Sequence, residues 1–202
     1  MKKLIYLMAA ALLAVSMLAG CGKAKSNESA TDSAEGMTGK HHVIIHMKDR
    51  GDISVELDGD SAPITVKNFL DLAGEGFYDG LTFHRIINGF MMQGGDPEGT
   101  GRGGSEKEIK GEFSSNGVDN PLTHTRGAIS MARSPEKDSA SSQFFIVHQD
   151  SPHLDGDYAV FGYVTEGMDI VDDICENTPV LDNNGTVANE DKPIIESIEV
   201  VD

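Results

Sequence analysis

The sequence predicts a mainly β fold, a closed eight-stranded antiparallel barrel capped by two α-helices. Short apolar segments recur between turn-rich stretches, and only two segments carry the 3.6-residue spacing of a helix. The 202 residues include 23 glycines, an excess over the usual ~7 % that suits a fold with many tight turns. These observations together favour a barrel over a helical bundle.

The first two strands are expected to form a hairpin. Residues 43–47 and 53–57 are rich in apolar side chains, with strict alternation in the second segment, and Gly51 lies in the turn between them. Six further strands are expected at residues 82–87, 90–93, 128–131, 144–147, 159–164 and 194–200.

The two helices have clear boundaries. The first runs from Pro63 to Ala73, where proline suits the first turn and the apolar residues share one face, and Gly74 ends it. The second covers about residues 168–176. Its apolar face includes Cys175, which we expect to be a small buried core residue.

The N-terminal segment predicts a lipid anchor. Lys2 and Lys3 precede an apolar segment, residues 4–18, that is short for a stable membrane span, and small residues then lead to Cys21. This arrangement resembles the lipobox of bacterial lipoproteins, which implies a diacylglyceryl group on the Cys21 thiol and cleavage just before it. The alternative is an ordinary signal-peptide cleavage site with an incidental cysteine.

Three regions follow from this interpretation. Residues 1–20 form a lipoprotein signal peptide, and residues 21–40 form the lipidated cysteine and a flexible linker, because Met37 is their only large apolar side chain. Residues 41–202 form one domain. We therefore expect the protein at the bacterial cell membrane, anchored by lipid on the extracytoplasmic face.

Charge and motif spacing exclude several function classes. The formal net charge is −17, and such a surface repels phosphate backbones, so we expect no nucleic-acid partner. Histidines 41, 42 and 46 lack further metal ligands, and we expect a solvated strand edge there rather than a metal site. Residues 99–104 fit the glycine pattern of dinucleotide-binding loops, but Asp96-Pro97 breaks the strand that this motif requires. We expect a surface loop there, and neither a cofactor nor a metal.

An arginine within an apolar strand is the first candidate functional residue. Arg85 lies between Phe83 and Ile87, and the apolar residues 90–92 follow, with Gln93 directly after them. A charged side chain among apolar ones is costly unless it is solvated, paired or used on a ligand. On this segment alone, a salt bridge within the barrel and a ligand-binding arginine are equally open.

Several separate blocks then share one resemblance. They are FHRIINGFMMQGGD (83–96), GEF (111–113), GAISMA (127–132), SSQFFI (141–146), HLDG (153–156) and VFG (160–162). In order and spacing, over about residues 43–201, they resemble the cyclophilin family of peptidyl-prolyl cis/trans isomerases. The resemblance implies the family's eight-stranded barrel with two helices, and catalysis of rotation about X–Pro bonds.

That reaction needs no nucleophile and no general base, because no bond is broken. The barrier is about 20 kcal/mol, and a donor aimed at the prolyl nitrogen stabilises the twisted amide more than either planar form. The resemblance makes Arg85 this donor and Gln93 the second catalytic residue, which holds Arg85 and the substrate backbone. It implies that the substrate-binding residues are Phe90, Met91, Ala132, Arg133, Gln143, Phe145, His153, Leu154 and Tyr158. Phe83 and Phe144 are expected to face the core.

The chain departs from the family pattern at a few positions. Asn88 stands where many members have proline, at a turn position that tolerates asparagine. Arg133 follows Ala132 where asparagine is usual. His153 stands where many eukaryotic members have tryptophan, and Tyr158 replaces a pocket histidine. These changes leave the isomerase residues in place and argue against strong cyclosporin binding.

Two functions remain to be compared. The first is a foldase that accelerates X–Pro rotation in secreted or surface proteins; the alternative is a proline-peptide-binding chaperone module with incidental catalysis. The intact set of Arg85, Gln93 and Phe145 favours the enzyme, because binding alone needs only the pocket. A lipid-anchored solute-binding protein would need a two-lobe pattern that is missing. The expected partners are proline-containing polypeptide clients and the membrane, which the chain reaches through Cys21, and we expect a monomer.

Overall fold

The computed structural model describes residues 37–201. The predicted signal peptide, Cys21 and most of the predicted linker lie outside these residues. Within the described part, neither helix is long and apolar enough to cross a membrane.

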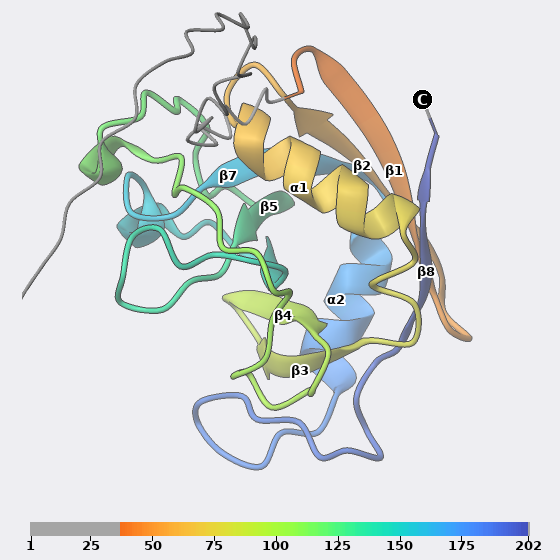
Figure 1. The fold of residues 1–202 in the computed structure, drawn as a ribbon. Helices are drawn as coiled ribbons and strands as arrows, with labels where there is room; N and C mark the ends of the chain where they lie inside the picture. Colours follow the sequence, from red (N-terminus) through yellow and green to blue (C-terminus); the bar gives the residue numbers. More distant parts are fainter. Residues whose placement is uncertain (1–36, 202) are drawn as a thin grey trace, which may run out of the picture. The chain divides into compact units, whose positions relative to one another are not determined.

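Eight antiparallel strands and two α-helices make up the fold (Figure 1). The strands are β1 (Lys40–Met47), β2 (Gly51–Asp58), β3 (Thr82–Ile87), β4 (Met91–Asp96), β5 (Ala128–Met131), β6 (Phe144–Val147), β7 (Val160–Glu166) and β8 (Ile195–Val200), and the helices are α1 (Pro63–Gly74) and α2 (Met168–Asn177). Each of these elements overlaps a segment that the sequence predicts, and the hairpin of β1 and β2 is confirmed.

The sheet is open, so the predicted closed barrel is wrong. Its strand order is β3-β4-β6-β5-β7-β2-β1-β8, and the sheet curls into a half-barrel. The outer edge of β3 is taken up by the irregular segment that precedes β8: the Ile86 amide donates to the Gly185 carbonyl, and the Phe83 amide donates to the Pro193 carbonyl. No ladder pairs β3 with β8 among the described residues: an isolated bridge links Thr82 to Ile194, just before β8, and Ile195 exchanges main-chain hydrogen bonds with Gly80 and Leu81, just before β3.

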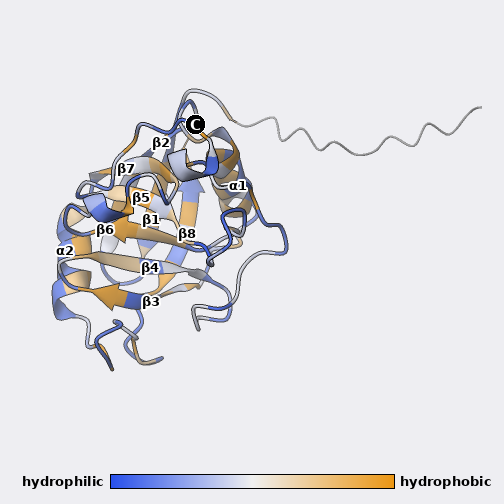
Figure 2. Ribbon diagram, turned by 90° about the vertical axis from the view of Figure 1, so that its left-hand side faces the viewer, coloured by the Kyte–Doolittle hydropathy of each residue, from blue (hydrophilic) through white to orange (hydrophobic). Residues whose placement is uncertain are grey.

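The two helices cover opposite ends of this curled sheet (Figure 1). α1 packs against β2 and β8, and α2 against β2, β3 and β4. Hydrophobic residues are concentrated along the strands and helices (Figure 2), and most of the apolar side chains of the strands are buried in the core. Phe69 of α1 is fully buried, and its ring lies 5.1 Å from Tyr78, 5.4 Å from Phe144 and 5.2 Å from Phe161, centroid to centroid.

Three predictions about single residues can be compared with the structure. Phe83 and Phe144 are both fully buried and lie in the core, as predicted. Cys175 is buried as well, and burial raises the pKa of its thiol to about 12. The prediction of a solvated strand edge at His42 and His46 is correct in part: His42 is exposed, but the strand is not an edge, because β1 lies between β2 and β8. Both side chains point away from the core, and His46 contacts carboxylates of the neighbouring strands.

β4 differs most from its prediction. The sequence predicts a strand over residues 90–93, whereas the strand continues through Gly94 and Gly95 to Asp96. A Cβ at Gly94 would lie 2.9 Å from the Thr82 carbonyl oxygen, and one at Gly95 would lie 2.5 Å from that of Ser142. Glycine, a poor strand residue on its own, is required here because neighbouring backbone passes so close.

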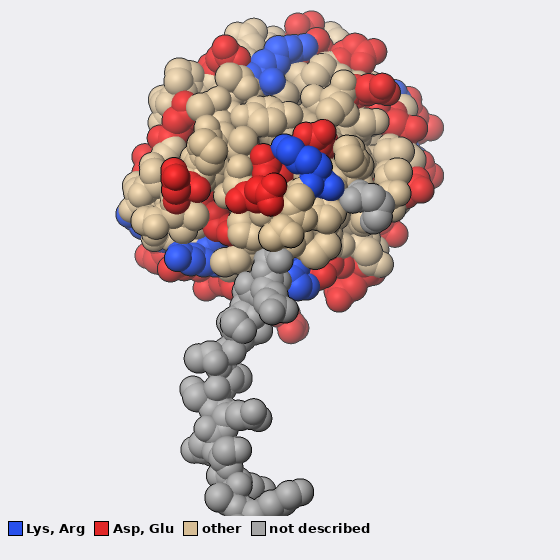
Figure 3. Space-filling model, turned by 90° about the horizontal axis from the view of Figure 1, so that it is seen from above, with Lys and Arg blue, Asp and Glu red and all other residues tan. Residues whose placement is uncertain are grey.

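Charged groups are spread over the outside of the domain. On the face that carries α1, acidic side chains are widely distributed and basic ones are scattered among them (Figure 3). This agrees with the excess of acidic over basic residues in the chain.

Candidate active site

The sheet brings most of the predicted site residues together in one small pocket. Nine of the eleven line a cavity of about 220 Å³: Arg85, Phe90, Met91, Gln93, Ala132, Arg133, Phe145, Leu154 and Tyr158. They come from β3, β4 and β6, the turn between β3 and β4, the loop after β5, and the short helical turn at Pro152–Leu154 with the loop that leads from it to β7. Strand pairing explains this, because β4 lies between β3 and β6 and places Gln93 opposite both Arg85 and Phe145.

Arg85 is half-buried at the edge of this pocket, and its guanidinium is held at two nitrogens. Nε donates to the Asn184 carbonyl oxygen at 2.9 Å. Nη1 donates to Oε1 of Gln93 at 3.3 Å and lies 3.8 Å from the sulfur of Met91. Burial lowers the pKa of Arg85, but a guanidinium stays protonated in proteins, so the pocket carries a fixed positive charge.

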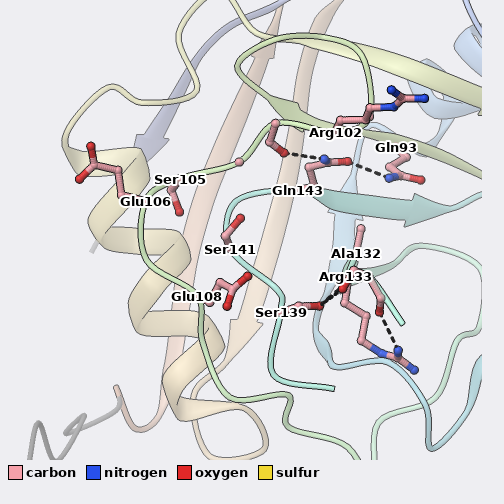
Figure 4. Close-up of a pocket in the computed structure, with 14 residues that line it drawn as sticks. Gln93, Arg102, Ser105, Glu106, Glu108, Ala132, Arg133, Ser139, Ser141 and Gln143 are labelled. Atoms are coloured by element: carbon pink, nitrogen blue, oxygen red, sulfur yellow. Dashed lines mark hydrogen bonds between the residues drawn. The ribbon is translucent and has the colours of Figure 1, made fainter. Parts of the chain in front are cut away.

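Gln93 is itself oriented by a second glutamine. Its Nε2 donates to Oε1 of Gln143 at 2.9 Å, and Nε2 of Gln143 donates to the Gly103 carbonyl oxygen at 2.7 Å (Figure 4). Each amide therefore has a defined direction, and the oxygen of Gln93 faces Arg85. One chain of hydrogen bonds therefore runs from the Gly103 carbonyl through the amides of Gln143 and Gln93 to Arg85.

Phe145 is part of the apolar wall of the pocket. Its side chain is buried, and its ring stacks on His124 at 5.9 Å and meets Tyr158 edge-on at 6.0 Å. His124 in turn contacts Asp155 at 2.8 Å through Nδ1 and Ser130 at 3.1 Å through Nε2. Its pKa is lowered because desolvation outweighs the nearby carboxylate.

The group of Ser130, His124 and Asp155 has the residue types of a hydrolase triad, yet it supports the pocket instead. Ser130 is 0 % exposed and His124 is 1 % exposed, so neither is available to a substrate. Sequence patterns do not identify these residues as a group, because 31 positions separate His124 from Asp155. Only the resemblance could have pointed to them, since HLDG contains Asp155.

Two predicted site residues lie just outside the pocket. His153 packs against Phe90, with ring centroids 5.4 Å apart and ring planes tilted by 37°, and so supports the wall from outside the pocket. Gln143 lines a larger cavity next to it. Arg133 lies at the border of the two cavities, with its guanidinium 4.6 Å from the Tyr158 ring and its Nε donating to the Asp157 carbonyl oxygen.

The neighbouring cavity is larger and more polar, about 650 Å³ (Figure 4). It shares Gln93, Ala132 and Arg133 with the first pocket, so a bound peptide could extend from one cavity into the other. Its remaining walls come from the glycine-rich loop and from the segment before β6; the side chains there include Ser105, Glu106, Glu108, Ser139 and Ser141. The glycine-rich loop thus borders this cavity.

No group of histidine, cysteine or carboxylate side chains within residues 37–201 is arranged to hold a metal ion. The arrangement offers a fixed cation beside an apolar cup, with no accessible nucleophile paired to a base.

Comparison with known proteins decides the family. The family model described as cyclophilin type peptidyl-prolyl cis-trans isomerase/CLD matches residues 42–200. The chain belongs to the cyclophilin family. It therefore catalyses the cis/trans isomerisation of peptidyl-prolyl bonds, the activity that its curated relatives are named for.

Among bacterial relatives, peptidyl-prolyl cis-trans isomerase B of Bacillus subtilis is 54 % identical over 123 residues, which cover 61 % of this chain and 82 % of that protein. A peptidyl-prolyl cis-trans isomerase of Helicobacter pylori is 50 % identical over 127 residues, covering 62 % and 75 %. A cyclophilin-type isomerase of Cryptosporidium parvum has a similar solved structure, with a TM-score of 0.71 at 33 % identity over 81 % of this chain and 99 % of that one. A second structure of that protein was obtained in the presence of the dipeptide Ala-Pro, with a TM-score of 0.70.

A further contact of this cyclophilin site, besides those of His124, was missed by sequence reasoning. Asn184 holds Nε of Arg85 through its main-chain oxygen, which any residue would supply. A main-chain contact leaves no signature in the residue types, so only the fold shows it.

Proposed function

We propose that this cyclophilin is a foldase for secreted or surface proteins, with Arg85 as the donor that stabilises the twisted X–Pro amide. The single observation that carries the catalytic role is the placement of a restrained guanidinium at the rim of an apolar pocket of about 220 Å³. A proline ring fits such a pocket by apolar contact with Phe90, Phe145 and Leu154. The prolyl nitrogen of the bound client then faces the charged group.

The proposed step is a rotation and moves no proton. As the amide twists, the prolyl nitrogen regains its lone pair, and a hydrogen bond from Nη2 of Arg85 to this nitrogen becomes favourable. In the planar forms the lone pair is delocalised, so the bond is weaker there. Because Nε and Nη1 are already bound to Asn184 and Gln93, little reorganisation is needed at the moment of reaction.

Gln93 has two proposed tasks in this step. Its oxygen accepts from Arg85, and its amide belongs to the chain that runs through Gln143 to the glycine-rich loop. The polar cavity beyond Gln143 is proposed to receive client residues next to the proline. His153 and Arg133 are proposed to support the pocket wall and its border.

We further propose an extracytoplasmic site of action, with the domain attached through lipid on Cys21. Uncatalysed prolyl isomerisation takes tens of seconds, which is slow enough to limit folding of exported chains. A linker of about 20 residues spans roughly 5–6 Å × √n, or about 25 Å, and would leave the pocket accessible to such clients.

The test of the catalytic role is Arg85→Ala in the domain that spans residues 37–202, assayed on a proline peptide by the rate of cis/trans exchange. Loss of one preorganised donor to a transition state lowers a rate by about 10²–10³-fold, and we expect kcat/KM to fall within that range. Arg50→Ala is the matched control, since Arg50 pairs with Asp173 away from the pocket. An Arg85→Ala rate equal to that of the unaltered domain would overturn the proposal and favour a binding module.

A further inference from the structure

The turn at residues 182–186 follows α2 and lies beside β3, on the edge that β4 does not occupy (Figure 1). The Ile86 amide donates to the Gly185 carbonyl oxygen at 2.8 Å. Arg85 and Thr186 form an isolated antiparallel bridge. The turn is therefore in register with the part of the strand that carries Arg85.

The turn also contacts the Arg85 side chain itself. Nε donates to the Asn184 carbonyl oxygen at 2.9 Å, and the side-chain Oδ1 of the same residue lies 3.3 Å from Nε. Gln93 holds Nη1 from the opposite strand. A guanidinium is planar and rigid, so contacts at two of its nitrogens set the direction of the third. No described residue accepts a hydrogen bond from Nη2, which leaves this nitrogen for the client.

Asp182 closes the turn that presents the Asn184 carbonyl. Its Oδ1 accepts from the amides of Asn184 at 2.9 Å and Thr186 at 3.1 Å, and its Oδ2 accepts from the Thr186 hydroxyl at 2.9 Å. Three hydrogen bonds from one exposed side chain thus define the backbone around Asn184. Such aspartate-closed turns are held locally, without help from the core.

Gly185 makes this geometry specific. Its φ is +80°, and a Cβ at this position would overlap the Ile86 carbonyl oxygen. The turn therefore approaches β3 more closely than any other residue at 185 would allow. A small displacement of the turn would therefore move the two carbonyl groups that bind the Ile86 amide and Nε of Arg85.

We propose that the 182–186 turn is a positioning element of the active site. Through the Asn184 carbonyl it sets the direction of the Arg85 guanidinium, and Asp182 holds it in the conformation that presents this carbonyl. The inference rests on the catalytic role proposed for Arg85. It concerns positioning alone, because neither Asp182 nor Asn184 lines the pocket that takes the proline.

The test compares two substitutions of one residue. Asp182→Ala removes all three hydrogen bonds, and we expect kcat for a proline peptide to fall about tenfold or more, since a displacement near 1 Å can cost ~10²-fold. The affinity for the peptide, measured by NMR titration, stays unchanged because the apolar walls are intact. Asp182→Asn keeps an oxygen for the two main-chain amides and can donate to the Thr186 hydroxyl, so it restores kcat while removing the charge.

A second measurement reports on the contact directly. In ¹⁵N-labelled protein, exchange of the Arg85 Nε proton with water is expected to be slow in the unaltered chain and in Asp182→Asn, and fast in Asp182→Ala. Asp58→Ala is the matched control, because Asp58 also accepts two main-chain amides in a turn, remote from Arg85. It is expected to leave both kcat and this exchange rate unchanged. Thr186→Val, which removes a single bond of the turn, serves if the alanine variant does not fold.

The outcomes separate this inference from the proposed function. If Arg85→Ala is inactive and Asp182→Ala retains full kcat, only the positioning role fails. An equal loss of kcat and peptide affinity in Asp182→Ala, or a further loss when it is added to Arg85→Ala, also overturns it, because either result shows general damage. If Arg85→Ala retains the normal rate, both ideas fall together.

Discussion

Arg85 is a charged residue that lies half-buried among the apolar side chains of the small pocket. A guanidinium beside Phe90 and Phe145 loses hydration, and burial lowers its pKa for that reason. The lost hydration is offset by hydrogen bonds from Nε to Asn184 and from Nη1 to Gln93. These two bonds leave Nη2 of the guanidinium without an acceptor among the described residues. A cation that is restrained and only partly paired is what a donor to a transition state requires.

His84, the neighbour of Arg85 on β3, is a contrasting case. Its side chain is buried, and neither ring nitrogen has a hydrogen-bond partner among the described residues. Desolvation lowers the pKa of His84, as it does that of His124. The unfolded chain takes up a proton near pH 6.5 that the folded protein resists, so these residues make the free energy of unfolding fall as the pH falls below about 6.5.

His84→Leu is therefore expected to flatten the pH dependence of stability. Each such histidine contributes a slope of up to ~1.4 kcal/mol per pH unit between the unfolded and the lower folded pKa. The pKa of His46 is raised by its hydrogen bond with Asp52, so His46 makes the free energy of unfolding rise as the pH falls. This contribution is the same in His84→Leu and in the unaltered domain and does not affect their difference. The measurement is urea unfolding between pH 5 and 7. Equal slopes for His84→Leu and the unaltered domain would contradict this account.

At the level of elements, the start of α1 depends on a residue far along the chain. Its N-cap residue, Ala62, has no side chain that can cap the helix. Glu112, which is 2 % exposed, fills this role: its carboxylate accepts from the amides of Ile64 at 3.1 Å and Thr65 at 2.8 Å, and from the Thr65 hydroxyl at 2.7 Å. The negative charge also suits the positive end of the helix.

Glu112→Ala is expected to destabilise the domain by about 2 kcal/mol or more, because it leaves buried donors at the helix start without an acceptor. Glu112→Gln keeps one acceptor oxygen and should lose less. Glu108→Ala is the matched control, since Glu108 is an exposed residue on the same segment. Denaturant unfolding measures all three. If Glu112→Ala were no less stable than Glu108→Ala, the cap would contribute nothing.

The sequence predicts the individual elements well and their connections less well. Local patterns suffice for α1, β3, β5 and β6, where apolar spacing and turn glycines agree. They fail for β4, because glycine disfavours a strand in local patterns. Gly94 and Gly95 are nevertheless required there, since the main chain at Thr82 and Ser142 passes too close for a Cβ. The Glu112 cap lies outside local patterns for the same reason: it joins residues 47 and 48 positions apart.

The same limit applies to the site. Motif matching located Arg85, Gln93 and Phe145, which meet because β3, β4 and β6 are neighbours in the sheet. It missed Asn184 and His124, which act through a main-chain oxygen and from behind the pocket wall. The side chains proposed to touch the substrate belong to recognisable sequence motifs, whereas the groups that hold those side chains in place do not.

For the whole molecule, the open sheet follows from the long connection between α2 and β8. Residues 178–194 contain no strand or helix, yet they cover the free edge of β3. An edge covered in this way is protected from pairing with another chain, as closure would protect it. The arrangement leaves the barrel incomplete and provides the loop that contacts Arg85.

Charge bears on how the whole molecule would meet a membrane. The chain has a net charge of −17, and acidic side chains are widely spread on the face seen in Figure 3. Anionic lipid surfaces attract basic segments and repel acidic ones. Attachment through the folded domain is therefore unfavourable, and lipid on Cys21 would have to supply the binding energy.

Cys21→Ala is expected to move the protein from the membrane fraction to the soluble fraction of a bacterial host that processes lipoproteins. The intact mass of the unaltered protein should show acyl chains that the variant lacks, and apolar burial of those chains would make its attachment insensitive to salt. Cys175→Ala is the matched control, because this buried thiol has no part in anchoring. Isomerase rates should be the same in all three proteins, since the pocket is formed by the domain alone. Membrane attachment that persisted in Cys21→Ala, or that salt removed from the unaltered protein, would show that the domain surface and not the lipid holds the chain.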